Sequence, residues 1–120
     1  MTLKILPYDK KDLRTSFKFL TDTFNISFGP NKDQWPNNLG NYSFDAYSAD
    51  IEKLLNNERF FFFGVYYDQE LVGQIELKKL TNNCGYVSLY YLKREFRNKG
   101  LGKQLDDFAF KELERQGCMK

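Results

Sequence analysis

One stretch of the chain, residues 86–117, constrains the fold more than any other, because its hydrophobic period changes half-way along it. The first part, Tyr86–Leu92, is rich in aromatic and branched side chains, which are typical of a half-buried strand. The second part carries apolar side chains at three- and four-residue spacing, which predicts an amphipathic helix: Leu101, Leu105, Phe108, Ala109 and Leu113. Gly117 stands where a glycine commonly ends a helix. The stretch therefore predicts a strand, a tight turn and a helix.

The turn between the strand and the helix, Arg97–Lys103, combines two glycines with three cations. The first N–H groups of a helix have no partner inside the helix, and they face the turn together with the positive end of the helix dipole. Gly100 and Gly102 remove Cβ atoms where an anion would approach. One helix-end interaction contributes only about 0.3–1 kcal/mol at an exposed surface, so a phosphate site needs several amides and cations together. This turn supplies both and predicts such a site.

Two other phosphate-binding loops do not fit the same residues. A Walker A loop needs a glycine at position 97 and a Ser or Thr at position 104, where the chain has Arg97 and Gln104. A dinucleotide fingerprint that begins at Gly100 needs a third glycine at position 105, where the chain has Leu105. Neither loop explains the turn.

The six residues from Arg97 to Gly102 match the Arg/Gln-x-x-Gly-x-Gly/Ala signature of the GNAT family of N-acetyltransferases, and Leu92–Leu105 resembles that family's fourth strand, turn and third helix. The resemblance implies that the turn holds the pyrophosphate of acetyl-CoA and that the preceding strand pairs with the pantetheine arm. The implied cofactor-binding residues are Leu92, Arg97, Asn98, Lys99, Gly100, Leu101, Gly102 and Lys103. An ordinary strand-to-helix turn on a solvated surface is the alternative.

The N-terminal half predicts one strand and two helices joined by a long loop. Residues 3–6 form a short strand, and residues 10–24 carry apolar side chains at helical spacing. Residues 25–42 are rich in Gly, Pro and Asn, which is typical of a loop, and a loop of this length is usually functional or disordered. A second helix follows over residues 44–57, with Ser48 as the candidate cap.

Residues 60–80 predict a hairpin. The segment 60–67, Phe-Phe-Phe-Phe-Gly-Val-Tyr-Tyr, is apolar throughout and is expected to be buried on both faces. Over residues 71–80, Ile75 and Leu77 alternate with Gln74, Glu76 and Lys78, so one face of that strand is expected to be polar. A turn over residues 81–85 then leads into the strand at 86–92.

The resulting order, β-α-α-β-β-β-α, predicts a single α/β (α+β) domain over residues 1–120 with a mixed, mostly antiparallel sheet. This order resembles the N-terminal portion of the acyl-CoA N-acyltransferase fold. The family's fifth strand and the segment after it, which often supplies a tyrosine acid, have no counterpart, so we expect a truncated domain. The strand at 86–92 would then be a sheet edge open to pairing. A homodimer that completes this edge is therefore expected as an alternative to a fragment.

The composition limits the chemistry. The chain contains no histidine, which excludes His-dependent triads and His-based zinc sites, and we expect no metal. The formal charge of +2 favours neither nucleic acid nor a membrane as the partner, and no apolar run is long enough to span a bilayer. Cys84 and Cys118 are too few for a disulfide framework, which predicts a reducing compartment and a cytoplasmic protein.

The reaction that the resemblance implies is direct acetyl transfer from acetyl-CoA to a primary amine, which makes the chain an N-acetyltransferase. The N–H near Leu92, where the family's strand often bulges, is the expected oxyanion donor. Glu76 and Tyr90 are the candidate catalytic residues. Glu76 would act as the base, directly or through water, and Tyr90 is expected to share one face with Tyr86 and Ser88 as a proton relay. A glutamate that is merely solvated on a strand is the alternative for Glu76.

The acceptor is a small-molecule or peptide amine that no motif identifies. By the resemblance, the segment between the first two helices lines the acceptor side, so Phe28, Trp35 and Tyr42 are candidate contacts. The alternative for Trp35 is that it only anchors the loop on the core.

Two further functions compete with the enzyme. The chain could bind CoA without catalysis, because one wall of the family's cofactor site has no counterpart. It could also bind nucleic acid through a cluster of cations near the turn: Lys93, Arg94, Arg97, Lys99 and Lys103. A methyl group added at Gly100 separates nucleic-acid binding from the acetyltransferase, because it would disturb an acetyl-CoA site at the turn and leave nucleic-acid binding nearly unchanged.

Overall fold

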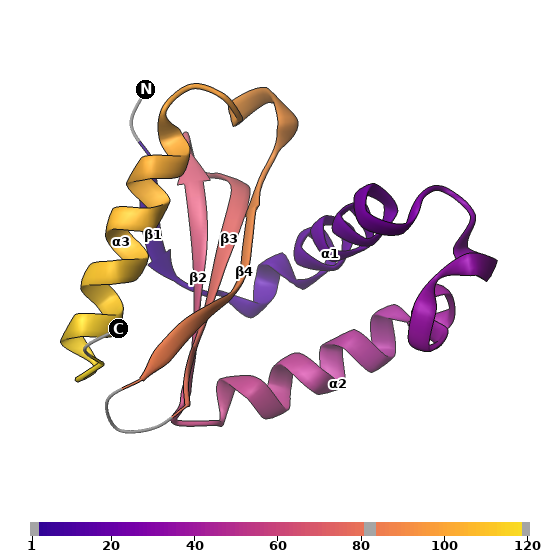
Figure 1. Ribbon diagram of the computed structural model, residues 1–120, viewed down its shortest axis with the longest axis horizontal. Coiled ribbons are helices and arrows are strands. Elements are labelled where there is room, and N and C mark those ends of the chain that lie inside the picture. Colours follow the sequence, from indigo (N-terminus) through magenta and orange to yellow (C-terminus); the bar gives the residue numbers. More distant parts are fainter. Residues whose placement is uncertain (1–2, 81–83, 119–120) are drawn as a thin grey trace.

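The computed structural model describes residues 3–80 and 84–118, and its centre is a four-stranded sheet with helices on both faces (Figure 1). The principal elements are β1 (Lys4–Pro7), α1 (Leu13–Phe28), α2 (Phe44–Leu55), β2 (Phe60–Tyr67), β3 (Glu70–Lys79), β4 (Gly85–Leu92) and α3 (Leu101–Arg115). Short 3-10 helices precede α1, occupy the connection from α1 to α2, and follow β4. The predicted β-α-α-β-β-β-α order is confirmed. Residues 81–83 of the predicted turn before β4 lie outside the described residues.

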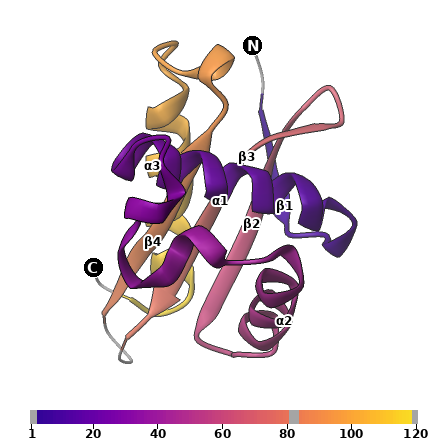
Figure 2. The same cartoon turned by 90° about the vertical axis from the view of Figure 1, so that its right-hand side faces the viewer.

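The strands lie in the order β1-β2-β3-β4, and each neighbouring pair is antiparallel. The sheet in the described part of the chain is thus antiparallel throughout. Figure 2 looks onto it from the side of α1 and α2, with β1 and β4 at opposite edges and α3 behind. One irregularity in β4 changes which of its side chains share a face. Glu76 pairs with Leu89 and Leu77 pairs with Val87, so Ser88 is an extra residue that forms a bulge.

Two hydrophobic clusters occupy the two faces of the sheet. On one face, Phe63, Val65 and Ile75 pack with Leu105 and Ala109 of α3. On the other face, Phe60 and Phe62 pack with Tyr47 and Ile51 of α2 and with residues of α1. Consecutive side chains of a strand point to opposite faces, so β2 contributes to both clusters. The prediction that residues 60–67 are buried on both faces is confirmed.

The first helix extends further than the sequence pattern predicted. It begins after a 3-10 turn over Lys10–Asp12 and continues past residue 24 to Phe28, where Gly29 with φ of 87° ends it. Asn25 is a weak helix former, but its carbonyl accepts a hydrogen bond from the Gly29 N–H at 2.8 Å, so the helix stops only at the Gly-Pro pair. The predicted loop is correspondingly shorter.

The serine that caps the second helix is Ser43, and not the predicted Ser48. Ser43 precedes α2 in an extended conformation, and its hydroxyl accepts a hydrogen bond from the Ala46 N–H at 3.1 Å. Ser48, the predicted cap, lies inside the helix, which ends at Leu55 rather than at residue 57. The third helix agrees with its pattern, and Gly117 beyond it has φ of 89°. None of the helices within the described residues has the length and apolar composition to cross a bilayer.

Candidate functional site

The basic turn joins the end of β4 to the N-terminus of α3 and is open to solvent (Figure 1). Asn98 and Gly100 adopt left-handed conformations, with φ of 60° and 74°. A Cβ atom added at Gly100 or at Gly102 would meet nothing within 4 Å. Leu101 is 3% exposed and packs in the core, so only its backbone can face a ligand. The turn therefore presents open backbone at a helix N-terminus, which is the geometry that suits a phosphate.

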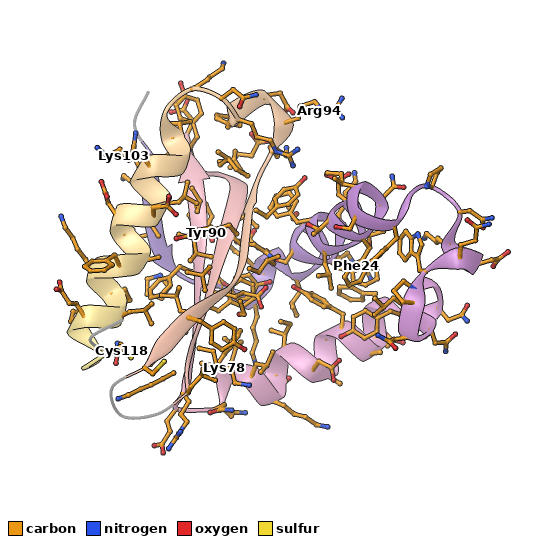
Figure 3. All side chains as sticks on the ribbon, in the orientation of Figure 1. Phe24, Lys78, Tyr90, Arg94, Lys103 and Cys118 are labelled. Carbon is orange, nitrogen blue, oxygen red and sulfur yellow. The ribbon has the colours of Figure 1, made fainter. Side chains whose placement is uncertain are left out.

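The cations of the turn do not all face outward in the same way. The Arg97 Nε donates to the Leu92 carbonyl at 2.5 Å, and the guanidinium carbon lies 5.3 Å from the centre of the Tyr91 ring. Arg97 thus ties the turn to the end of β4. Lys99 and Lys103 are exposed. Figure 3 shows Lys103 and Arg94 at the same end of the molecule, on either side of the connection between β4 and α3.

Glu76 is largely covered by other residues, although its side chain is not fully buried. It lies on the face of β3 that α1 and α2 cover, and burial raises the pKa of its carboxyl group from 4.5 to about 7. Gln74, two residues away on the same face, is fully buried, and its amide donates to Glu76 Oε2 at 3.4 Å. The polar side chains share one face of the strand as the alternation predicted, but the alternative of a merely solvated Glu76 is wrong, because two helices distant in sequence pack over this face.

A pocket of about 370 Å³ opens over Glu76. It is lined by Leu20 of α1, by Tyr42 of the connection, by Glu76, and by five residues of α2: Tyr47, Asp50, Ile51, Lys53 and Leu54. The Tyr42 hydroxyl donates to the Asp50 carboxylate. Burial, and then this carboxylate, raise the pKa of Tyr42 above its usual value. The pocket thus brings a carboxyl group with a raised pKa together with aromatic and aliphatic walls.

The predicted partner Tyr90 lies on the opposite face of the sheet. Tyr90 pairs with Ile75 and faces α3, where burial and the Asp106 carboxylate, its hydrogen-bond partner, raise its pKa. Tyr86 pairs with Lys78 and faces the other way. The prediction that Tyr86, Ser88 and Tyr90 share one face is wrong, because the bulge at Ser88 shifts the alternation by one residue.

The bulge itself lies at Ser88 and not at Leu92, where it was expected. Leu92 pairs regularly with Gly73, and its carbonyl is occupied by Arg97. The Ser88 hydroxyl donates to the backbone carbonyl of Glu76 at 3.2 Å. The irregular part of β4 is therefore next to the backbone of Glu76.

The three aromatic residues proposed for the acceptor side are separated by the fold. Tyr42 lines the pocket over Glu76. Trp35 is buried, donates its indole N–H to the Gly29 carbonyl at 2.9 Å and packs against Phe24, so it anchors the connection. Phe28 is 41% exposed at the end of α1 and lines neither cavity.

Trp35 also lines a larger cavity, of about 830 Å³, between α1 and the end of β4. Its walls mix acidic and basic side chains, and inside it the Tyr91 hydroxyl donates to Asp22 at 2.6 Å. Sequence reasoning missed this pair and also Tyr47 of the smaller pocket. Their only sequence signal is an apolar periodicity that core residues share. No group of three or more His, Cys, Asp or Glu side chains in the described ranges could hold a metal ion.

Comparison with known proteins agrees with this arrangement. A model of the Acetyltransferase (GNAT) family matches residues 22–120. An uncharacterized N-acetyltransferase from Lactobacillus delbrueckii subsp. lactis is 27% identical over 123 residues, which cover 89% of this chain and 65% of that protein. A spermidine N(1)-acetyltransferase from Thermoplasma acidophilum is 33% identical over 79 residues, 66% of this chain and 48% of that protein. The chain thus spans about half to two thirds of the length of these relatives.

Comparison of the fold with solved structures also finds acetyltransferases. The crystal structure of the PaiA N-acetyltransferase from Thermoplasma acidophilum in complex with coenzyme A matches with a TM-score of 0.74 and 25% identity, over 98% of this chain and 77% of that one. The family match covers most of the chain, and the four-stranded sheet with its basic turn agrees with it. The chain therefore belongs to the GNAT family of acetyltransferases.

Proposed function

We propose that this chain transfers an acetyl group from acetyl-CoA to a primary amine, with Glu76 as the general base. The observation that carries the proposal is the Glu76 carboxyl group, which lines a pocket and has a pKa raised to about 7. A base is most effective when its pKa is close to the working pH, because it is then both ionised and basic. Pockets with a strongly perturbed carboxyl group are favoured places for such chemistry.

The cofactor is proposed to bind along β4 and the following turn. The open backbone between Gly100 and Lys103 would receive the pyrophosphate, with Lys99 and Lys103 adding positive charge. The pantetheine arm would lie beside β4 up to Leu92. The choice of ligand is supported by the crystal structure of the PaiA N-acetyltransferase, which shares the fold and is in complex with coenzyme A.

In the proposed reaction, Glu76 takes a proton from the ammonium group, and the amine nitrogen attacks the thioester carbonyl carbon. The carbon–sulfur bond then breaks, the attacking nitrogen loses its second proton, and CoA leaves as a thiolate that takes up that proton, while Glu76 releases the first proton to solvent. A backbone N–H at the Ser88 bulge, next to Glu76, is the proposed donor to the carbonyl oxygen, in place of the N–H near Leu92. Tyr90 receives no part in this proton transfer, because its hydroxyl lies on the α3 face beside Asp106.

The test is to incubate the chain with acetyl-CoA and a panel of primary amines and to follow the release of free thiol and the mass of the product. We expect acetylation that Glu76→Gln slows by about 10²–10⁴-fold, the usual contribution of a general base. Glu58→Gln, an exposed residue before β2, is the matched control and should leave the rate unchanged. Wild-type rates in Glu76→Gln would contradict the role of this residue. Binding of acetyl-CoA without transfer to any amine would support the non-catalytic alternative.

A further inference from the structure

We propose that the acceptor is a compact primary amine with a single positive charge and an apolar body. This inference rests on the proposed function of Glu76, because the reacting nitrogen must lie next to the base. It concerns the pocket of about 370 Å³ and not the larger cavity, which Glu76 does not line.

The walls of this pocket are chiefly apolar. Leu20 of α1 and Ile51 and Leu54 of α2 supply aliphatic surface. The rings of Tyr42 and Tyr47 lie 6.3 Å apart and nearly perpendicular, at 89°. Such rings accept an alkyl or aromatic body, and their faces also attract an ammonium group. A volume near the lower limit for ligand pockets suits a small molecule rather than an oligosaccharide.

The net charge of the side chains that line the pocket is balanced by one cation. The titratable residues that line it are Glu76 on β3, Tyr42 in the connection, and Tyr47, Asp50 and Lys53 on α2; α1 contributes only Leu20. With Glu76 and Asp50 ionised and Lys53 protonated, the lining carries one net negative charge.

A second ammonium group would have to share the Asp50 carboxylate with the Tyr42 hydroxyl and would lie near the cation of Lys53. Asp50 already accepts a hydrogen bond from Tyr42, and Lys53 lines the same pocket. Placing an unmatched charge against the aliphatic walls is unfavourable. The pocket therefore discriminates against polyamines and in favour of a monoamine, although one relative of this chain is a spermidine acetyltransferase.

The test measures binding separately from catalysis. Protein with labelled leucine methyl groups is titrated with 2-phenylethylamine and with spermidine at pH 8, and the methyl signals of Leu20 and Leu54 are followed by NMR. We expect saturable shifts at both leucines with 2-phenylethylamine and at least roughly ten-fold weaker binding of spermidine, because its further charges are unmatched. The ratio of kcat/KM for the two amines should follow the same order.

A charge substitution tests the reason for the preference. Lys53 is exposed, so the Lys53→Glu variant should fold. Its added carboxylate should lower the ratio of the affinities for 2-phenylethylamine and spermidine by about two- to five-fold. Lys111→Glu, the same change at an exposed position of α3, is the control and should keep the preference.

The outcomes separate this inference from the proposed function. Tighter binding or faster acetylation of spermidine by the wild-type chain would overturn the monoamine inference while leaving acetyl transfer intact. Absence of methyl shifts at Leu20 and Leu54 with either amine would overturn the pocket itself. Methyl shifts with the monoamine but no acetylation would support the pocket and contradict the enzyme.

Discussion

At the residue scale, Glu76 is held where its charged form is disfavoured. Its carboxyl group lies between β3 and the helices α1 and α2, and burial is the cause of its raised pKa. The amide of Gln74 is its hydrogen-bond donor, at the long distance of 3.4 Å. A weak donor only partly offsets the loss of water, so the ionised form that the proposed reaction needs destabilises the fold.

This cost predicts how stability depends on pH. Between pH 4.5 and 7 the folded chain binds a proton at Glu76 that the unfolded chain has released, so stability falls as the pH rises through this window. The difference between the two pKa values corresponds to about 3 kcal/mol. Glu76→Gln resembles the protonated carboxyl group. The variant should therefore match the wild type below pH 4.5 and be more stable by about that amount above pH 7.

Urea denaturation of the wild type and Glu76→Gln at pH 4.5 and pH 8 checks this prediction. At each pH, subtracting one free energy of unfolding from the other cancels the contribution of the other titrating groups. Glu58→Gln, at an exposed position, is the control and should follow the wild type at both pH values. Equal stability of Glu76→Gln and the wild type at pH 8 would show that Glu76 is not held in a desolvating site.

At the scale of elements, the two glycines at the start of α3 differ in backbone conformation. Gly100 has φ of 74°, a conformation that L residues rarely adopt, whereas Gly102 lies within the first turn of the helix. Neither position has an atom within 4 Å of an added Cβ, so crowding within the protein does not contribute. The same substitution at the two positions therefore tests backbone conformation alone.

We expect Gly100→Ala to destabilise the chain by about 1–2 kcal/mol, because alanine is strained in the left-handed region. It should also weaken acetyl-CoA binding, because the turn loses its shape and its Cβ enters the space proposed for the pyrophosphate. Gly102→Ala should stabilise α3 by up to about 1 kcal/mol, since alanine is the better helix former. The GNAT signature accepts alanine at this position, so acetyl-CoA binding should be kept.

Thermal unfolding and calorimetric titration with acetyl-CoA measure these two effects in the same samples. Gly102→Ala serves as the control for Gly100→Ala. Unchanged acetyl-CoA affinity in Gly100→Ala would place the cofactor elsewhere, and loss of affinity in both variants would mean that any Cβ on the turn blocks the site.

The same elements show how far the sequence predicts this molecule. The change of period between β4 and α3 and the basic turn are local features, so a single stretch of sequence predicts them. The face on which a side chain lies is less local. One extra residue at Ser88 places Tyr90 and Tyr86 on opposite faces, and nothing in the alternation of residues 86–92 marks that residue. The cover over Glu76 depends on α1 and α2, which lie far away in sequence.

At the scale of the whole molecule, the two edges of the sheet differ in how readily they can pair with another strand. β1 forms one edge with only four residues and ends in Pro7, which limits further pairing. β4 forms the other edge with eight residues, and Tyr86 and Tyr90 on it are 41% and 39% exposed. A long edge with exposed aromatic side chains favours pairing with another strand. The two curated relatives are longer than the part that matches this chain, so in them other residues can take this place.

In the absence of acetyl-CoA, whose pantetheine arm would take the same edge, we therefore propose that two copies of a chain of these 120 residues pair along β4. Sedimentation should show a mass that rises with concentration from 14.3 kDa toward twice that value. Tyr86→Lys should weaken this association by roughly two- to ten-fold, because pairing along the edge would bring like charges close together. Phe110→Lys makes the same change of aromatic to cation at a position of α3 that is 51% exposed, and should associate like the wild type. A wild-type chain that stays monomeric at all concentrations would contradict the pairing, and an effect of Phe110→Lys equal to that of Tyr86→Lys would move the interface away from the strand edge.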